Sequence, residues 1–139
     1  VMKMGRRLRK DGFNAQGVGV SLLFADHTHW HGQNKTSIPL YADSDFYERV
    51  RMLLVQAPMR PVRILAVFCY DLTHDIYAQQ SLFEADNRKR VLTQVIDRVQ
   101  DRFGDFVITP GRMLAMQETV KDRIAFGRIR ELTKPIHTT

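Results

Sequence analysis

The chain has 139 residues, 44% of them hydrophobic and 26% charged, which is the composition of one globular domain of ordinary size. Its formal net charge of +6 favours a polyanionic partner. The sequence has no apolar run near the ~20 residues of a membrane span, and its basic N-terminus lacks the apolar segment of a signal peptide. Cys69 is the only cysteine, so an internal disulfide is excluded and a reducing, cytoplasmic location is expected.

Basic side chains crowd the first ten positions, and this stretch stops at Asp11-Gly12. We interpret residues 1–12 as a basic linker that leads into the domain proper. The cations of this linker are Lys3, Arg6, Arg7, Arg9 and Lys10.

Two strands that form a hairpin are predicted next. Val18, Val20, Leu22 and Phe24 alternate on one side, which is the period of a β-strand. The sequence "ADHT" turns the chain, and "HWHGQNKTSIPL" reads as the second strand. On this second strand one face carries Trp30, Thr36, Ile38 and Leu40, and the other carries His29, His31, Gln33, Lys35 and Ser37.

A helix, a strand and another helix follow along the chain. The first helix, "DSDFYERVRMLLVQAP", has a cap at Ser44 or Asp45. The apolar run "PVRILAVFCYDL" predicts a central strand. The second helix, "DNRKRVLTQVIDRVQDRFG", ends at Gly104, and "DFVITPGRML" gives a last short strand. The apolar stripes are Phe46, Val50, Leu53, Leu54 and Ala57 on the first helix, and Val91, Leu92, Val95, Ile96, Val99 and Phe103 on the second.

The order ββαβαβ predicts an α+β fold, a four-stranded mixed sheet with both helices packed on one face. The opposite face is left for solvent or a partner, and it carries the polar side of the second strand. We place the domain at residues 13–115 and a polar C-terminal tail at 116–139.

The alternating His27, His29 and His31 raise three alternatives: a metal site, a pH switch, and the solvent-exposed face of a β-strand. Residues two apart on a strand point the same way, about 6.5 Å apart, so two imidazoles could share a zinc ion. The third histidine lies at the turn, and no Cys or carboxylate has a recognised ligand spacing. We favour a hydrogen-bonding surface, which would bind phosphate more strongly when the imidazoles are protonated.

The segment "CYDLTHD" could also be read as a nucleophile and base set. Cys69 lies inside an apolar run, however, which is more typical of a buried small hydrophobic residue. The basic "NRKR" at 87–90 is interpreted as a solvated helix face.

Three segments resemble the C-terminal little finger domain of Y-family, DinB-type (ImpB/MucB/SamB-like) translesion DNA polymerases. They are the strand "PVRILAVFCYDL", the motif "QQSLFE" and the helix "VLTQVIDRVQDRFG". The hairpin carrying Lys35-Thr36-Ser37 and the ββαβαβ order agree, and the similarity covers about residues 5 to 115. The family pattern has Gly before Val67, whereas this sequence has Ala66.

The resemblance implies that the sheet binds the major groove of primer-template DNA and grips both backbones without sequence preference, in error-prone synthesis during DNA repair and the SOS response. Phosphate contacts position a protein on DNA without specifying sequence. The expected DNA contacts are Arg6, Arg7, Arg9, Lys10, His31, Gln33, Lys35, Thr36, Ser37, Arg60 and Arg63.

The motif Gln79-Gln80-Ser81-Leu82-Phe83 resembles the pentapeptide with which bacterial polymerases dock on the sliding clamp. Leu82 and Phe83 would fill an apolar pocket, and Gln79 would hydrogen-bond at its rim. The competing interpretation is that Leu82 and Phe83 anchor the loop to the domain's own core.

The catalytic carboxylates of the family, which hold two metal ions, belong to a palm domain that nothing in this sequence matches. We therefore expect a fragment that is monomeric, non-catalytic alone and free of cofactors and metal. The parent protein would be a bacterial, nucleoid-associated DNA polymerase whose palm needs Mg²⁺.

Three rival interpretations stay open: an adaptor-type homologue with an inactive palm, a freestanding RNA-binding module, and a small metal-dependent hydrolase. An RNA-binding module should expose aromatic side chains on its strands for base stacking. The predicted polar face offers His29, Gln33 and Lys35 instead, which argues against such a module.

Overall fold

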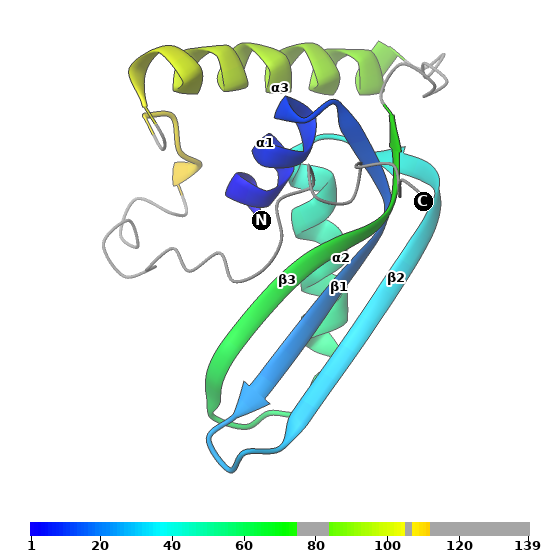
Figure 1. Cartoon of the computed structure of the whole chain (residues 1–139), viewed down its shortest axis with the longest axis vertical. Coiled ribbons are helices and arrows are strands. Elements are labelled where there is room, and N and C mark those ends of the chain that lie inside the picture. Colours follow the sequence, from blue (N-terminus) through cyan, green and yellow to red (C-terminus); the bar gives the residue numbers. More distant parts are fainter. Residues whose placement is uncertain (75–83, 105–106, 112–139) are drawn as a thin grey trace, which may run out of the picture. The chain divides into compact units, whose positions relative to one another are not determined.

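A computed structural model describes residues 1–74, 84–104 and 107–111. Its elements are α1 (Met2–Lys10), β1 (Phe13–Phe24), β2 (His29–Leu40), α2 (Asp43–Val55), β3 (Val62–His74) and α3 (Glu84–Phe103) (Figure 1). The chain divides into two compact units, residues 1–98 and 99–139. Within the described ranges, none of the helices has the length and apolar content needed to cross a membrane.

The described sheet has three antiparallel strands in the order β2-β1-β3. The predicted hairpin and α+β class are confirmed, but the predicted four-stranded mixed sheet with two helices is wrong, because these residues form three strands and three helices. Residues 107–111, the described part of the expected last strand, are not in a strand. β3 was expected at the centre, yet β1 occupies that place and β3 lies at an edge. Ile64 and Leu65 of β3 are accordingly about half exposed.

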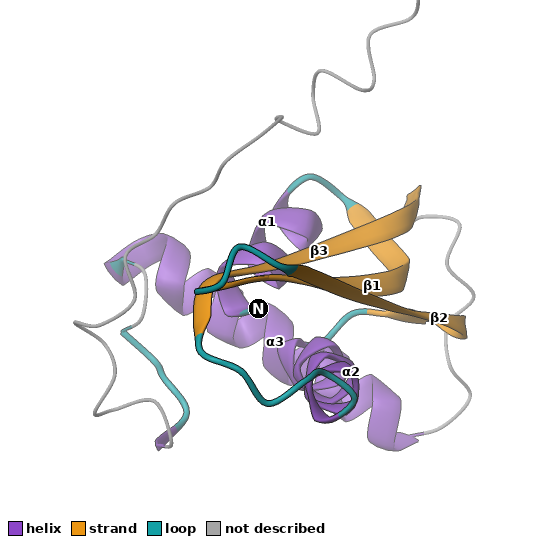
Figure 2. Cartoon of the chain, turned by 90° about the horizontal axis from the view of Figure 1, so that it is seen from below, coloured by secondary structure: helices purple, strands orange, loops and turns teal. Residues whose placement is uncertain are grey.

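The core of the first unit lies between β1 and α2, as the alternation of apolar residues predicted. Val18, Val20 and Leu22 point to one side of β1 and are at most 2% exposed. α2 runs along this face of the sheet (Figures 1 and 2). Its buried residues are Phe46, Val50 and Leu53. Since burial of each such side chain contributes about 1.5–3 kcal/mol, this layer fixes which face of the sheet stays free.

Residues 2–10 form a helix that the sequence did not predict. Its nine residues are too few to show a periodic apolar stripe, and only Leu8 supplies a large buried apolar side chain. Arg7, Arg9 and Lys10 occupy its last turn, where positive charge is favourable because the C-terminal end of a helix is the negative end of its dipole.

α3 is confirmed as a helix, and Gly104 follows it with a φ of +104°, as expected for a C-cap glycine. The prediction that its apolar stripe packs on the sheet is wrong, because Val91, Leu92 and Val95 are between 41% and 60% exposed. Within the first unit, α3 instead bonds through its polar side, where Asp97 meets Arg9.

Candidate nucleic-acid interface

The sheet face opposite α2, which we call the front face, consists of four cross-strand rows. Each row has one residue of β2, one of β1 in the middle and one of β3, paired by the strand register. From the hairpin turn inward, the rows are His29–Leu23–Ile64, His31–Ser21–Ala66, Gln33–Gly19–Phe68 and Lys35–Gly17–Tyr70. The front face is therefore polar along β2 and apolar along β3.

The polar half of the front face is the one predicted from the sequence. His29, His31, Gln33 and Lys35 alternate along β2 and are all exposed. Lys35 Nζ lies 2.6 Å from Asp71 Oδ2, and this carboxylate raises the pKa of Lys35. The pair keeps the ammonium in place while 61% of the Lys35 side chain remains accessible, so the charge can still meet an anion.

Asp71 is a counter-ion that the sequence analysis missed. Its backbone has a φ of +52°, which is uncommon for a residue with a side chain and most readily adopted by Asn and Asp. Its carboxylate reaches Lys35 across the central strand, at the level of Gly17. No local sequence pattern predicts this ion pair, because Asp71 and Lys35 are brought together only by the register of the three strands.

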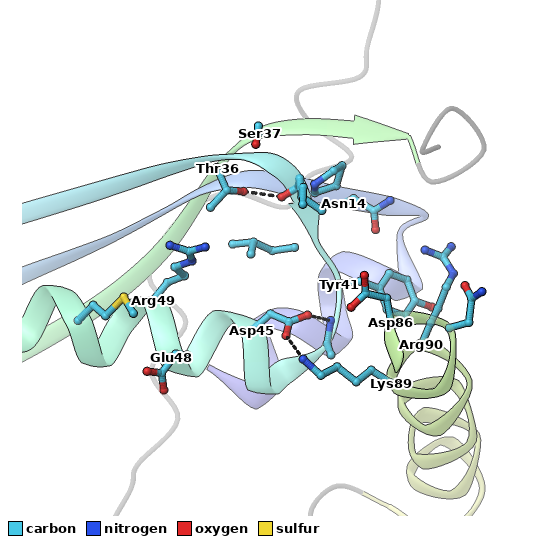
Figure 3. Close-up of a pocket in the computed structure, with 16 residues that line it drawn as sticks. Asn14, Thr36, Ser37, Tyr41, Asp45, Glu48, Arg49, Asp86, Lys89 and Arg90 are labelled. Atoms are coloured by element: carbon cyan, nitrogen blue, oxygen red, sulfur yellow. Dashed lines mark hydrogen bonds and ion pairs between the residues drawn. The ribbon is translucent and has the colours of Figure 1, made fainter. Parts of the chain in front are cut away.

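Thr36 does not share a face with Lys35 and Ser37. Figure 3 shows Thr36 and Ser37 on opposite sides of β2. The β1–β2 register shifts here, so that Gly17 faces Lys35 but Ala15 faces Leu40, and the Thr36 hydroxyl donates to the Ile38 carbonyl. Of the predicted face of Trp30, Thr36, Ile38 and Leu40, Ile38 departs, because the irregularity leaves it 70% exposed, whereas Leu40 at the strand end is buried as predicted.

The apolar half of the front face carries two aromatic rings on two glycines. A Cβ built on Gly19 would lie 2.2 Å from Cζ of Phe68, and one on Gly17 would lie 2.3 Å from Cζ of Tyr70. Only glycine allows these rings to lie so close to the central strand. The expectation of a front face without aromatic side chains is wrong, since the β3 register brings both rings onto it. The argument against an RNA-binding module, which relied on a polar face without aromatic side chains, is therefore no longer valid.

The hairpin end of the sheet holds Arg60 beside the turn. Arg60 Nη1 lies 3.3 Å from Asp26 Oδ2, and both side chains are about half exposed. The hydroxyl and backbone N–H of Thr28 donate to Asp26 and lower the pKa of this carboxyl, with a smaller effect from Arg60. Arg63 is exposed near the start of β3. This end of the sheet thus presents two of the predicted cations.

Arg9 differs from the other cations predicted to contact DNA because its side chain is only 4% exposed. Its guanidinium binds both oxygens of Asp97, at 2.6 and 2.8 Å, and Asp43 Oδ1 at 3.0 Å. It also donates to the Tyr41 carbonyl. With its donors turned inward, Arg9 joins α1, α2 and α3 and is poorly placed to meet phosphate.

Three further cations of α1 were predicted to contact DNA. Lys10 is exposed, and Arg6 and Arg7 are partly exposed. α1 ends at Lys10 and β1 begins at Phe13, so Lys10 lies near the end of the sheet opposite to the hairpin turn that Arg60 flanks.

A pocket of about 450 Å³ lies on the α2 side, between the end of β2, α2 and the first turns of α3 (Figure 3). Lys89 Nζ crosses it to Asp45 Oδ1 at 3.3 Å. Its charges balance and select no ligand class: the cations are Arg49, Lys89 and Arg90, and the carboxylates are Asp45, Glu48 and Asp86.

Two other candidate sites gain no support from the described residues. In the ranges that the structure describes, no three His, Cys, Asp or Glu side chains come together as a metal site. Burial raises the pKa of the Cys69 thiol, which is unlike an activated nucleophile. Gln79, Leu82 and Phe83, the predicted clamp contacts, lie outside the described residues.

Comparison with known proteins identifies the chain's relatives. The model of the impB/mucB/samB family C-terminal domain matches residues 1–82, more than half of the chain. DNA polymerase IV 2 of Bacillus subtilis (strain 168) is 34% identical over 124 residues, which are 86% of this chain and 30% of the relative. DNA polymerase IV of Moorella thermoacetica is 31% identical over 109 residues, 76% of this chain and 27% of the relative. The chain thus spans less than a third of these relatives' length. The chain belongs to the impB/mucB/samB family of C-terminal domains, the little finger domains of Y-family DNA polymerases of the polymerase IV type.

Proposed function

We propose that this domain binds primer-template DNA through its front face, without sequence preference, and holds it for a translesion DNA polymerase. The observation that carries the proposal is the line of exposed polar side chains along β2, from His29 to the cation Lys35. Lysine binds phosphate as a point charge, and a phosphate contact carries no sequence information. A front face of this kind suits a protein that must pass over any template.

The length of the sheet supports the same conclusion. β1 has 12 residues, which at about 3.3 Å per residue extend over roughly 36–40 Å. One turn of B-DNA is about 34–36 Å long. Arg60 at the hairpin end and Lys10 at the α1 end are therefore spaced to reach phosphates about one turn apart, with Lys35 between them.

The direct test is equilibrium binding of the whole chain to a fluorescein-labelled primer-template, followed by anisotropy across a salt series. If phosphate contacts dominate, log K falls linearly with log salt, by about 0.9 for each contact in duplex DNA. Lys35→Ala should weaken binding and make the slope shallower by about that amount. Two primer-templates of unrelated sequence should bind equally.

Lys89→Ala is the matched control for this variant. Lys89 is also an exposed lysine in an ion pair with an aspartate, but it lies on α3 and not on the front face. Its substitution should leave the affinity and the salt slope close to those of the unmodified domain. Equal losses in both variants, or an affinity that ignores salt, would remove the support for a front-face phosphate site.

We further propose that the whole polypeptide acts as an error-prone DNA polymerase and docks on a sliding clamp through Gln79, Leu82 and Phe83. The support for the first part is the similarity to full-length DNA polymerase IV proteins. The support for clamp docking is the resemblance of residues 79–83 to the clamp-binding pentapeptide of bacterial polymerases. Replacing Leu82 and Phe83 by Ala should abolish retention of the chain on an immobilised sliding clamp while its circular dichroism spectrum is unchanged.

A further inference from the structure

Phe68 and Tyr70 lie flat on the central strand. The Cβ position of Gly17 is 2.3 Å from Cζ, 2.3 Å from Cε2 and 2.6 Å from Cε1 of Tyr70. A point beyond the ring edge, in line with Cζ, would be clearly closer to Cζ than to its two neighbours. The similar distances therefore put Gly17 beneath the face of the ring, and Gly19 has the same relation to Phe68.

One face of each ring is consequently turned toward the sheet and the other away from it. Both side chains are partly exposed, so the outward faces are accessible. They are adjacent on β3, with ring centroids 6.4 Å apart and planes tilted by 41°. Together they form an aromatic platform, defined here as the outward faces of Phe68 and Tyr70.

A charge that suits phosphate adjoins this platform. Lys35 occupies the same cross-strand row as Tyr70, on the far side of Gly17. Asp71 Oδ2, 2.6 Å from Lys35 Nζ, raises the pKa of this lysine, so the ammonium stays charged beside the ring of Tyr70 in the same row. Sequence-tolerant single-strand binding sites combine the same two parts, a ring under the base and a cation along the backbone.

We propose that the aromatic platform stacks unpaired nucleobases, so that the front face binds single-stranded DNA as well as duplex. The inference rests on the proposed function, since it uses the same face and the same lysine. The distance between the two rings favours bases that are unpaired and unstacked over bases in a duplex. Successive bases in a stacked strand are separated by about 3.4 Å along the axis, roughly half the 6.4 Å between the rings. Two neighbouring bases can each cover one ring only after they have unstacked.

The experiment compares two single strands on the unmodified chain. One is a fluorescein-labelled oligothymidine of about 12 nucleotides, and the other has the same length and charge but an abasic residue at every position. Phosphate contacts are the same for both strands, whereas only the first has bases to stack. Stacking on one ring predicts at least about fivefold tighter binding of the oligothymidine, and two occupied rings predict more.

Variants then assign the difference to the rings. Phe68→Leu or Tyr70→Leu should reduce the preference for the oligothymidine by about fivefold or more, whereas Phe68→Tyr and Tyr70→Phe should retain it. Tyr47→Leu is the matched control, because Tyr47 is an aromatic residue of α2 that is 39% exposed and lies away from the front face. It should leave the preference unchanged.

Equal affinity of the unmodified chain for the two strands would overturn the inference, whatever the variants do. If the primer-template still binds with the salt dependence and the Lys35 effect described above, only the aromatic platform is refuted. If neither duplex nor single strand binds, the proposed function fails with it. A preference for oligothymidine that persists in the Phe68→Leu, Tyr70→Leu double variant would also overturn the assignment.

Discussion

Replacing Arg9 by Met tests whether the three helices are held together by one guanidinium. Met keeps much of the length and apolar volume of the side chain but removes four hydrogen bonds, to Asp97, Asp43 and the Tyr41 carbonyl. The side chains of Asp43 and Asp97 are only 26% and 18% exposed, so both carboxylates would lose their partner in a poorly hydrated place.

Removing one partner of a buried ion pair typically costs about 3–5 kcal/mol. A domain of ordinary stability unfolds with a free energy of about 5–15 kcal/mol, so the loss should be a large fraction of the total. The assay is urea unfolding followed by the fluorescence of Trp30, the only tryptophan, whose ring lies over Gly32. Arg7→Met, on the same helix, is the control and should change the free energy of unfolding by about 0.5 kcal/mol at most.

The same variant should show a specific pH dependence. Burial raises the pKa of Asp43, and Arg9 opposes that rise, so removing Arg9 should raise the pKa further. A carboxyl whose pKa is higher in the folded state contributes stability below its unfolded pKa of about 3.9 and loses it as the pH rises through the folded pKa. Arg9→Met should therefore be less destabilising near pH ~4 than at pH ~7. A loss below about 1 kcal/mol at neutral pH, or one that does not vary with pH, would refute the reasoning.

Two further substitutions test the front face. Asp71→Asn should tighten duplex binding, because the DNA no longer competes with this carboxylate for Lys35, while Asn keeps the left-handed backbone. Weaker binding in the anisotropy assay would contradict this. Gly19→Ala brings a Cβ within 2.2 Å of Phe68 Cζ, so the ring must move away from the strand. We expect the free energy of unfolding, measured with urea, to fall by about 1–3 kcal/mol. Ser21→Ala, one row away, should change stability by about 0.5 kcal/mol at most, and equal effects of the two would show that the ring does not lie on Gly19.

Much of the local structure follows from the sequence because the periodicity of one segment encodes it. The alternation of Val18, Val20 and Leu22 determined which side of β1 is buried, and the apolar stripe containing Phe46 determined the inner side of α2. The exposed β2 row that includes Lys35 follows from the same alternation. The resemblance to little finger domains likewise lay in short motifs.

Tertiary structure alone decided the features that depend on residues far apart in the chain. Arg9 looked like one more linker cation, but Asp97, 88 residues away, fixes it in the interior. An apolar run does not reveal whether its strand will lie at the centre or at the edge, and β3 is at the edge of the described sheet. The sequence contains Gly17 and Tyr70 without any sign that they meet. Only the β1–β3 register lays the ring on the glycine and puts an aromatic platform beside Lys35.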